Sequence, residues 1–149
     1  MLFRSVATWV AIHANHPREF TDSACAALAL MADAGIALVS QSVLLKGVND
    51  NVETLSALMR AFVINRVKPY YLHHPDLAPG TSHFRGTIEA GQALMRQLRL
   101  VTSGLAQPMY VLDVPGGAIK APLGPDYVRS DEGGLQVLSG EGIWLDYKG

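Results

Sequence analysis

The chain has little of what disulfide-rich, nucleic-acid-binding and membrane proteins are made from. Its 149 residues include a single cysteine, Cys25, which excludes an intrachain disulfide framework. Only 17% of the residues are charged and the net charge is −1, so no electrostatic footprint for nucleic acid or anionic lipid is present. No apolar run reaches the length of a membrane span. We therefore expect a soluble, cytoplasmic protein that binds neither nucleic acid nor membranes.

Strand-like and helix-like patterns alternate along the chain, and 49% of the residues are hydrophobic. Helices are expected where apolar residues recur every three or four positions, and Thr21 is a good N-cap for the first of them. The pattern predicts strands at 6–13, 36–45, 67–72 and 107–112, helices at 22–35, 52–64 and 87–100, and a C-terminal hairpin bracketed by the turns 133–134 and 139–140. Such alternation predicts parallel strands joined by helical crossovers, hence an α/β fold.

Polar residues gather where these strands end, which is where parallel sheets bind their ligands. His13, Asn15 and His16 follow the first strand, Gln41 lies within the second, and His73, His74 and Asp76 follow the third. A metal site is one interpretation of the histidines. They lack the cysteine or glutamate spacing of a strong zinc motif, so we predict no metal here. His73 and His74 are interpreted as loop residues.

The segment from Asp113 to Lys120 carries a carboxylate and a lysine on either side of a Pro-Gly-Gly turn. The neighbours of the lysine are small or apolar, and burial among them would favour the neutral amine that forms Schiff bases. The alternative is an ordinary surface loop with a solvated lysine. Two carboxylates in one pocket, Asp76 and Asp113, would suit a cationic amine, although either could instead cap a turn.

Five separated blocks resemble, in order and spacing, the C-terminal half of the lysine 2,3-aminomutases, radical-SAM enzymes that also use pyridoxal phosphate. The resemblance runs from about Trp9 to about Asp146. It is carried by the blocks His13–Thr21, Gln41–Asp50, Pro69–Leu77 with His83–Arg85, Thr102–Gly104 and Asp113–Lys120.

The resemblance implies a partial (βα) barrel of the radical-SAM type, comprising roughly the last three βα units in residues 1–100 and a C-terminal β-hairpin extension in residues 101–149. It implies that Lys120 forms the Schiff base with pyridoxal phosphate. Asp76 and Asp113 would clamp the ε-ammonium of an L-lysine substrate, and His13 and Gln41 would line the S-adenosylmethionine side. The reaction implied is the interconversion of L-lysine and β-lysine, in which an adenosyl radical starts the migration of an amino group.

The chain also departs from this family. The family holds a [4Fe–4S] cluster on a Cys-x3-Cys-x2-Cys motif, and a cluster needs several thiolates, so Cys25 alone cannot supply it. Ala118 and Ile119 replace two glycines of a four-glycine run. We expect the chain to be inactive by itself and the full-length form to be a homo-oligomer. Arg85 is expected to pair with an acidic group.

Three interpretations stay open: a truncated or mis-started aminomutase, including the relative that makes β-lysine for elongation factor P; half of a split enzyme with a cluster-bearing partner chain; and a non-catalytic remnant. The acidic pair favours lysine over glutamate, because the glutamate-using relatives do not keep it.

Overall fold

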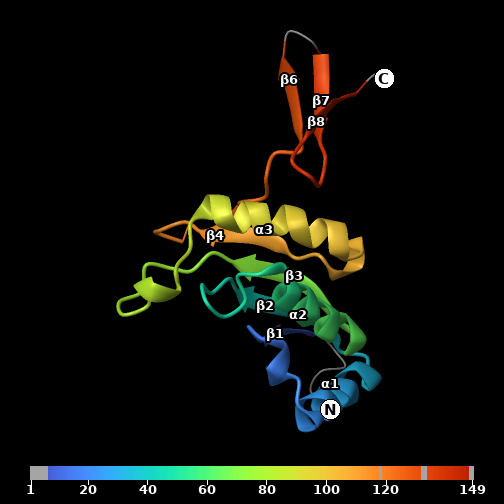
Figure 1. The fold of residues 1–149 in the computed structure, drawn as a ribbon. Coiled ribbons are helices and arrows are strands. Elements are labelled where there is room, and N and C mark those ends of the chain that lie inside the picture. Colours follow the sequence, from blue (N-terminus) through green and yellow to red (C-terminus); the bar gives the residue numbers. More distant parts are fainter. Residues whose placement is uncertain (1–6, 118, 132–133, 148–149) are drawn as a thin grey trace.

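The structure is a computed structural model that describes residues 7–117, 119–131 and 134–147. A five-stranded sheet and three α-helices form its main body, and a smaller sheet follows (Figure 1). The strands of the main sheet are β1 (Trp9–His13), β2 (Ala37–Val43), β3 (Val67–His73), β4 (Met109–Asp113) and β5 (Lys120–Pro122). The helices are α1 (Asp22–Asp33), α2 (Val52–Ile64) and α3 (Ile88–Val101), with short 3-10 turns at Pro17–Glu19, Ser82–Phe84 and Gly104–Ala106.

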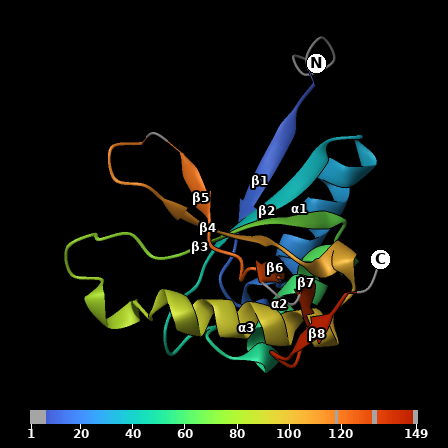
Figure 2. The same cartoon turned by 90° about the horizontal axis from the view of Figure 1, so that it is seen from above.

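The five strands lie in the order β1-β2-β3-β4-β5. The first four are parallel, and each is connected to the next by one helix, whereas β5 runs antiparallel to β4. All three helices lie on the same face of the sheet (Figure 2). The fold is therefore α/β with a mixed sheet, as the alternating pattern predicts. Among the described residues, no helix combines the length and the apolarity needed to cross a membrane.

Each α-helix begins directly after a side-chain cap. Thr21, Asn51 and Thr87 each adopt an extended backbone, and the side-chain oxygen of each accepts a hydrogen bond from a first-turn backbone N–H. Such a cap satisfies one of the N–H groups that have no partner within the helix. In the described residues, the start of each of these three α-helices is therefore marked by one capping residue, and the predicted cap at Thr21 is confirmed.

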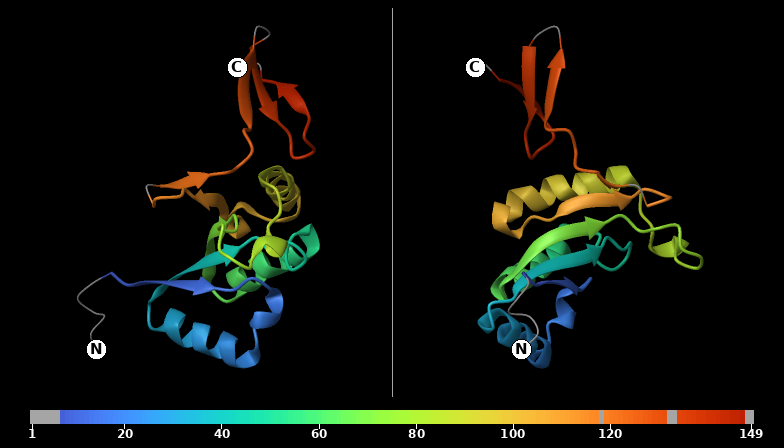
Figure 3. Two further views of the ribbon diagram at one scale, coloured as in Figure 1. Left: turned by 90° about the vertical axis from the view of Figure 1, so that its left-hand side faces the viewer. Right: turned by 180° about the vertical axis from the view of Figure 1, so that it is seen from behind.

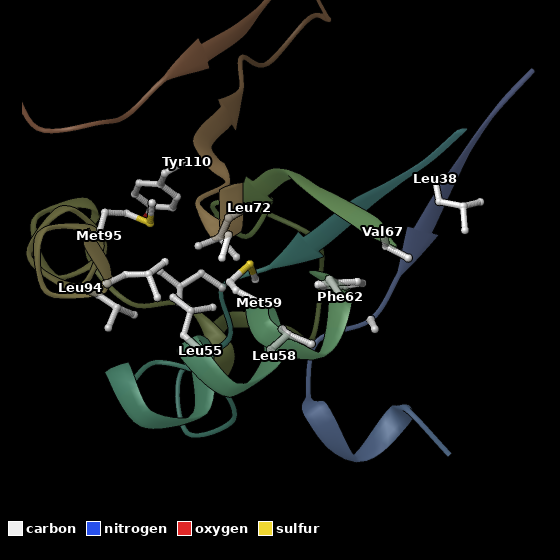
Figure 4. Close-up of a cluster of buried hydrophobic side chains, with 14 of the residues drawn as sticks. Leu38, Leu55, Leu58, Met59, Phe62, Val67, Leu72, Leu94, Met95 and Tyr110 are labelled. Atoms are coloured by element: carbon white, nitrogen blue, oxygen red, sulfur yellow. The ribbon is translucent and has the colours of Figure 1, made fainter. Parts of the chain in front are cut away.

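The hydrophobic core lies between the sheet and α2 and α3 (Figure 4). Helix α2 contributes most of it, through Leu55, Leu58, Met59 and Phe62, which are all fully buried. Strands β3 and β4 and one turn of α3 contribute further residues. The core residues from these four elements are Leu55, Leu58, Met59, Phe62, Val67, Leu72, Leu94, Met95, Leu98 and Tyr110. The apolar spacing in the sequence thus identifies the buried faces of α2 and α3 correctly.

Strand residues alternate between this core and the opposite side of the sheet, which we call the helix-free face. In β2, Leu38, Ser40 and Ser42 are buried toward the helices, while Gln41 between them is only half-buried. Because successive side chains in a strand point to opposite faces, Gln41 lies on the helix-free face. The same alternation places Trp9 there, since its neighbour Val10 packs on the core.

The second sheet consists of β6 (Val128–Asp131), β7 (Gly134–Leu138) and β8 (Trp144–Asp146), all antiparallel. It stands beyond α3, away from the main sheet (Figure 3). The Arg99 Nε of α3 donates a hydrogen bond to the Tyr127 hydroxyl at 3.1 Å, beside the entry to β6. The predicted hairpin is thus extended by a third strand. Its first turn includes Gly133, which lies outside the described residues.

Several predicted boundaries need correction. Strand β1 begins at Trp9 (Val6 lies outside the described residues), β2 ends at Val43, and β3 continues through His73. Strand β5 has no counterpart in the prediction. Cys25 is only partly buried, and its Sγ contacts the Phe20 carbonyl.

Candidate functional site

The ends of the parallel strands bring a row of polar side chains together. In the register of the main sheet, His13 of β1 stands beside Gln41 of β2, and Asp113 of β4 stands beside Lys120 of β5. His73 ends β3 between them. Four of the five residues were predicted as site residues from the sequence. At the carboxyl ends of its parallel strands, the sheet therefore brings together residues that are up to 107 positions apart in the chain, from His13 to Lys120.

Asp113 and Lys120 form an ion pair across the β4–β5 hairpin. The Lys120 Nζ donates to Asp113 Oδ1, and each side chain is 39% exposed. Gly116 and Gly117 form the turn between them with φ of 94° and 75°, a left-handed conformation that favours glycine. The Lys120 hydrogen bond holds the pKa of the Asp113 carboxyl below its ordinary value, and His73 contributes in the same direction. Asp113 is therefore a carboxylate at neutral pH.

Of the two interpretations of Lys120 that the sequence leaves open, the structure favours the solvated lysine over the buried one. Lys120 begins the edge strand of the sheet, and the preceding apolar residue, Ile119, is 63% exposed rather than packed around the amine. The lysine is matched with Asp113 instead, and its Nζ lies 5.8 Å from the centroid of the Tyr71 ring.

His73 is the residue of this site that sequence reasoning missed. Its Nδ1 lies 3.1 Å from Asp113 Oδ2, its Nε2 lies 3.3 Å from the Gln41 amide nitrogen, and its side chain is only 12% exposed. Burial lowers the pKa of His73, while the Asp113 charge acts in the opposite direction. A period-of-two pattern could have found it, since Tyr71 and His73 alternate with the buried Leu72.

His74 points away from this row. It is buried, and its Nδ1 lies 2.7 Å from the Tyr110 hydroxyl on the helix side of the sheet. Burial lowers its pKa, and the nearby charge of Arg85 lowers it further. Neither His73 nor His74 is a loop residue of the kind expected from the sequence, because the first belongs to β3 and the second is packed inside.

Asp76 and Asp113 line the same cavity of about 450 Å³. Its other lining residues are mostly apolar and include Leu77, Ile88 and Leu112. The Arg85 guanidinium donates to the backbone carbonyl of Asp76, so the acidic partner expected for Arg85 is a carbonyl oxygen instead. Arg85 also lines the cavity, so its charge there is mixed. The mostly apolar lining suits an alkyl chain, and the two acidic residues suit a positive charge on it.

His13 lies at the β1 end of the row, where its Nε2 is 3.1 Å from the Asn15 side-chain amide nitrogen. The fully buried Asn49 connects the ends of β1 and β2: its amide nitrogen donates to the carbonyls of Asn15 and Val43. Its Oδ1 accepts from the Leu45 backbone N–H. Asn49 therefore fixes the positions at which β1 and β2 present their polar residues.

Comparison with known proteins supplies a family. No model of a known protein family matches the chain. The chain is 42% identical over 140 residues to the L-lysine 2,3-aminomutase of Fusobacterium nucleatum, which covers 93% of the chain and 33% of that relative. It is 41% identical over 148 residues to the L-lysine 2,3-aminomutase of Clostridium subterminale, covering 99% and 36%. The glutamate 2,3-aminomutase of Clostridioides difficile is 37% identical over 130 residues, covering 87% and 31%.

The chain thus spans about a third of the length of the curated relatives that it matches. The similarity extends over nearly the whole chain and includes the strands that form the polar row. The chain belongs to the lysine 2,3-aminomutase family.

Proposed function

We propose that the chain is the C-terminal part of a lysine 2,3-aminomutase-type enzyme that interconverts L-lysine and β-lysine. Its four parallel strands and outer helices would be the last units of a radical-SAM partial barrel. The observation that carries the proposal is the Asp113–Lys120 pair at the strand ends, beside a cavity that Asp76 shares.

The residues present fit the amine-binding side of pyridoxal phosphate. Lys120 offers a primary amine that solvent reaches, and the glycine turn beside it is open, since a Cβ at Gly116 or Gly117 would meet no atom within 4 Å. When bound, the cofactor supplies the delocalised π-system through which an amino group can migrate between neighbouring carbons. We assign Lys120 to hold it, and His13 and Gln41 to line the S-adenosylmethionine side. The [4Fe–4S] cluster is assigned to a part of the enzyme other than this chain.

Asp113 would serve two cations in turn. In the structure its Oδ1 accepts from the Lys120 ammonium. With Lys120 holding the cofactor, that oxygen would be available to the ε-ammonium of the substrate. Asp76, at the same cavity, would provide the second carboxylate. This arrangement favours lysine over glutamate, because two carboxylates attract an ammonium group and repel a side-chain carboxylate.

The assignment of Lys120 is tested by trapping. The purified protein is incubated with pyridoxal phosphate, reduced with borohydride, digested and analysed by mass spectrometry. We expect the reduced cofactor on Lys120, loss of this label in Lys120→Arg, and an unchanged label in the matched control Lys46→Arg, whose lysine is exposed and distant in sequence. Equal labelling of Lys46, Lys68 and Lys120 would contradict the assignment.

The intact mass of the natural polypeptide decides how the enzyme is assembled. A mass near 16.0 kDa would mean that another chain must supply the cluster. A mass near that of the relatives, about three times larger, would place the cluster on the same polypeptide.

A further inference from the structure

We propose that His73 is a positioning residue of this site, which holds one oxygen of Asp113 and so keeps the other directed at an ammonium group. Its place in the reaction rests on the proposed function, because the ammonium groups concerned are those of Lys120 and of the substrate. The contact itself follows from the geometry of β3 and β4.

The two oxygens of Asp113 are divided between two partners. Oδ2 lies 3.1 Å from His73 Nδ1, and Oδ1 accepts from Lys120 Nζ. The carboxylate is 39% exposed, so solvent would otherwise let it turn about its terminal torsion, which has only broad energy wells. His73 is held more firmly, because its side chain is only 12% exposed and its ring packs edge-on against Tyr71. A fixed ring therefore orients a more mobile carboxylate.

Asp113 and Gln41 together determine which ring nitrogen of His73 carries the proton. The Gln41 amide nitrogen, 3.3 Å from His73 Nε2, can only donate, so Nε2 must accept. The proton of the neutral ring then resides on Nδ1, which donates to Asp113. In histidines generally, the hydrogen bond made by one ring nitrogen decides whether the other nitrogen carries the proton.

The charge of His73 matters as much as its orientation. Charged or titratable groups face the ring from several elements: Asp113 on β4, Lys120 on β5, Tyr71 on β3 and Asp76 beyond it. Burial is the largest influence and favours the neutral ring. A neutral donor orients Asp113 without cancelling its charge, whereas an imidazolium would compete with the ammonium group for the same carboxylate.

The first test reads the tautomer directly. Nitrogen-15 spectra of the histidine rings in the full natural polypeptide are expected to show His73 protonated at Nδ1, assigned by its loss in His73→Asn. Gln41→Leu is expected to retain this tautomer, because the Asp113 carboxylate only accepts and so still requires a proton on Nδ1. A wild-type ring protonated at Nε2, or loss of the Nδ1 proton in Gln41→Leu, would overturn the proposal.

The second test measures how firmly Asp113 holds Lys120. Trace acetylation modifies free amines, and the ratio of Lys120 to Lys46 acetylation in one sample cancels differences in reagent. His73→Phe keeps an aromatic ring but removes the donor, and is expected to raise this ratio about threefold or more, as for a weakened charge-assisted hydrogen bond. His73→Asn, which returns a donor near Nδ1, is expected to restore the ratio to within about twofold of wild type.

His83→Phe is the matched control, because His83 is exposed and lies in a 3-10 turn away from the row. An unchanged ratio in His73→Phe, or equal effects of the Phe and Asn variants, would overturn the proposal. If His73→Phe does not fold, the wild-type tautomer and His73→Asn still decide it. Neither readout requires the cofactor, so a failure of trapping at Lys120 would count against the proposed function alone.

Discussion

Replacing Asn49 by leucine should destabilise the protein by about as much as losing three buried hydrogen bonds. Asn49 has no exposed surface, and its side chain makes contacts of 2.7 to 2.9 Å with three backbone groups. These are the N–H of Leu45 and the carbonyls of Asn15 and Val43. Leucine has a similar shape but no polar atom, so all three backbone groups lose this partner.

The magnitude follows from the cost of each group. A hydrogen bond contributes about 1 kcal/mol net, and a buried group left without a partner costs about 1–3 kcal/mol. Burial of the new apolar surface offsets part of this loss, about 1–2 kcal/mol. The expected decrease in the free energy of unfolding is about 3 kcal/mol, which corresponds to about 6–12 °C in Tm for a domain of this size.

Urea denaturation of Asn49→Leu and wild type measures this difference. Asn65→Ala is the control, since the Asn65 side-chain amide donates to the single carbonyl of Ala61 and should cost about 1 kcal/mol. Hydrogen exchange adds a local readout, because the Leu45 amide should exchange faster in Asn49→Leu. A loss below about 1 kcal/mol with unchanged exchange at Leu45 would refute the reasoning that Asn49 connects the two strand ends.

Two further predictions concern the helix side of the sheet. Burial lowers the pKa of His74, so the unfolded chain binds more protons as the pH falls below 6.5, and stability should then decrease. Urea denaturation at about pH 7.5 and about pH 5.5 should show a smaller decrease in His74→Gln than in wild type, and equal decreases would contradict this. In Gly91→Ala, the added Cβ would overlap the buried Tyr110 ring, which should lower the free energy of unfolding by about 1–3 kcal/mol. This loss should exceed the gain of about 1 kcal/mol from the higher helix propensity of alanine. Thermal unfolding that shows a raised Tm would exclude that overlap.

Helix α2 shows why much of the fold can be predicted from the sequence. Its ends, Val52 and Ile64, match the prediction because Asn51 supplies the cap and the apolar spacing of Leu55, Leu58 and Phe62 fits one helical face. Both signals are local. The order of strands and helices follows from them, and with it the edge of the sheet where polar residues collect.

The surroundings of Lys120 show where sequence reasoning stops. Strand β5 has three residues and ends in Pro122, so it is too short to show a period of two. Its existence depends on pairing with β4 across a glycine turn, and that pairing sets Lys120 opposite Asp113. Apolar neighbours in sequence suggested burial, but the edge strand leaves Ile119 exposed. His73 was missed for a related reason, since its partners lie on β2 and β4 and none is near it in sequence.

The helix-free face combines two features that are hard to reconcile in a sheet left in water. It carries the polar row from His13 to Lys120, and it also exposes large apolar side chains, with Trp9 at 67% and Met109 at 52%. Burial of such groups would stabilise the structure by about 1.5–3 kcal/mol each. In a barrel this face would be the interior, where apolar residues line the wall and polar residues meet the ligands. The matched relatives are about three times as long as this chain. In the proposed full-length enzyme, the rest of the polypeptide would close the barrel over the apolar side chains and leave the polar row facing the ligands.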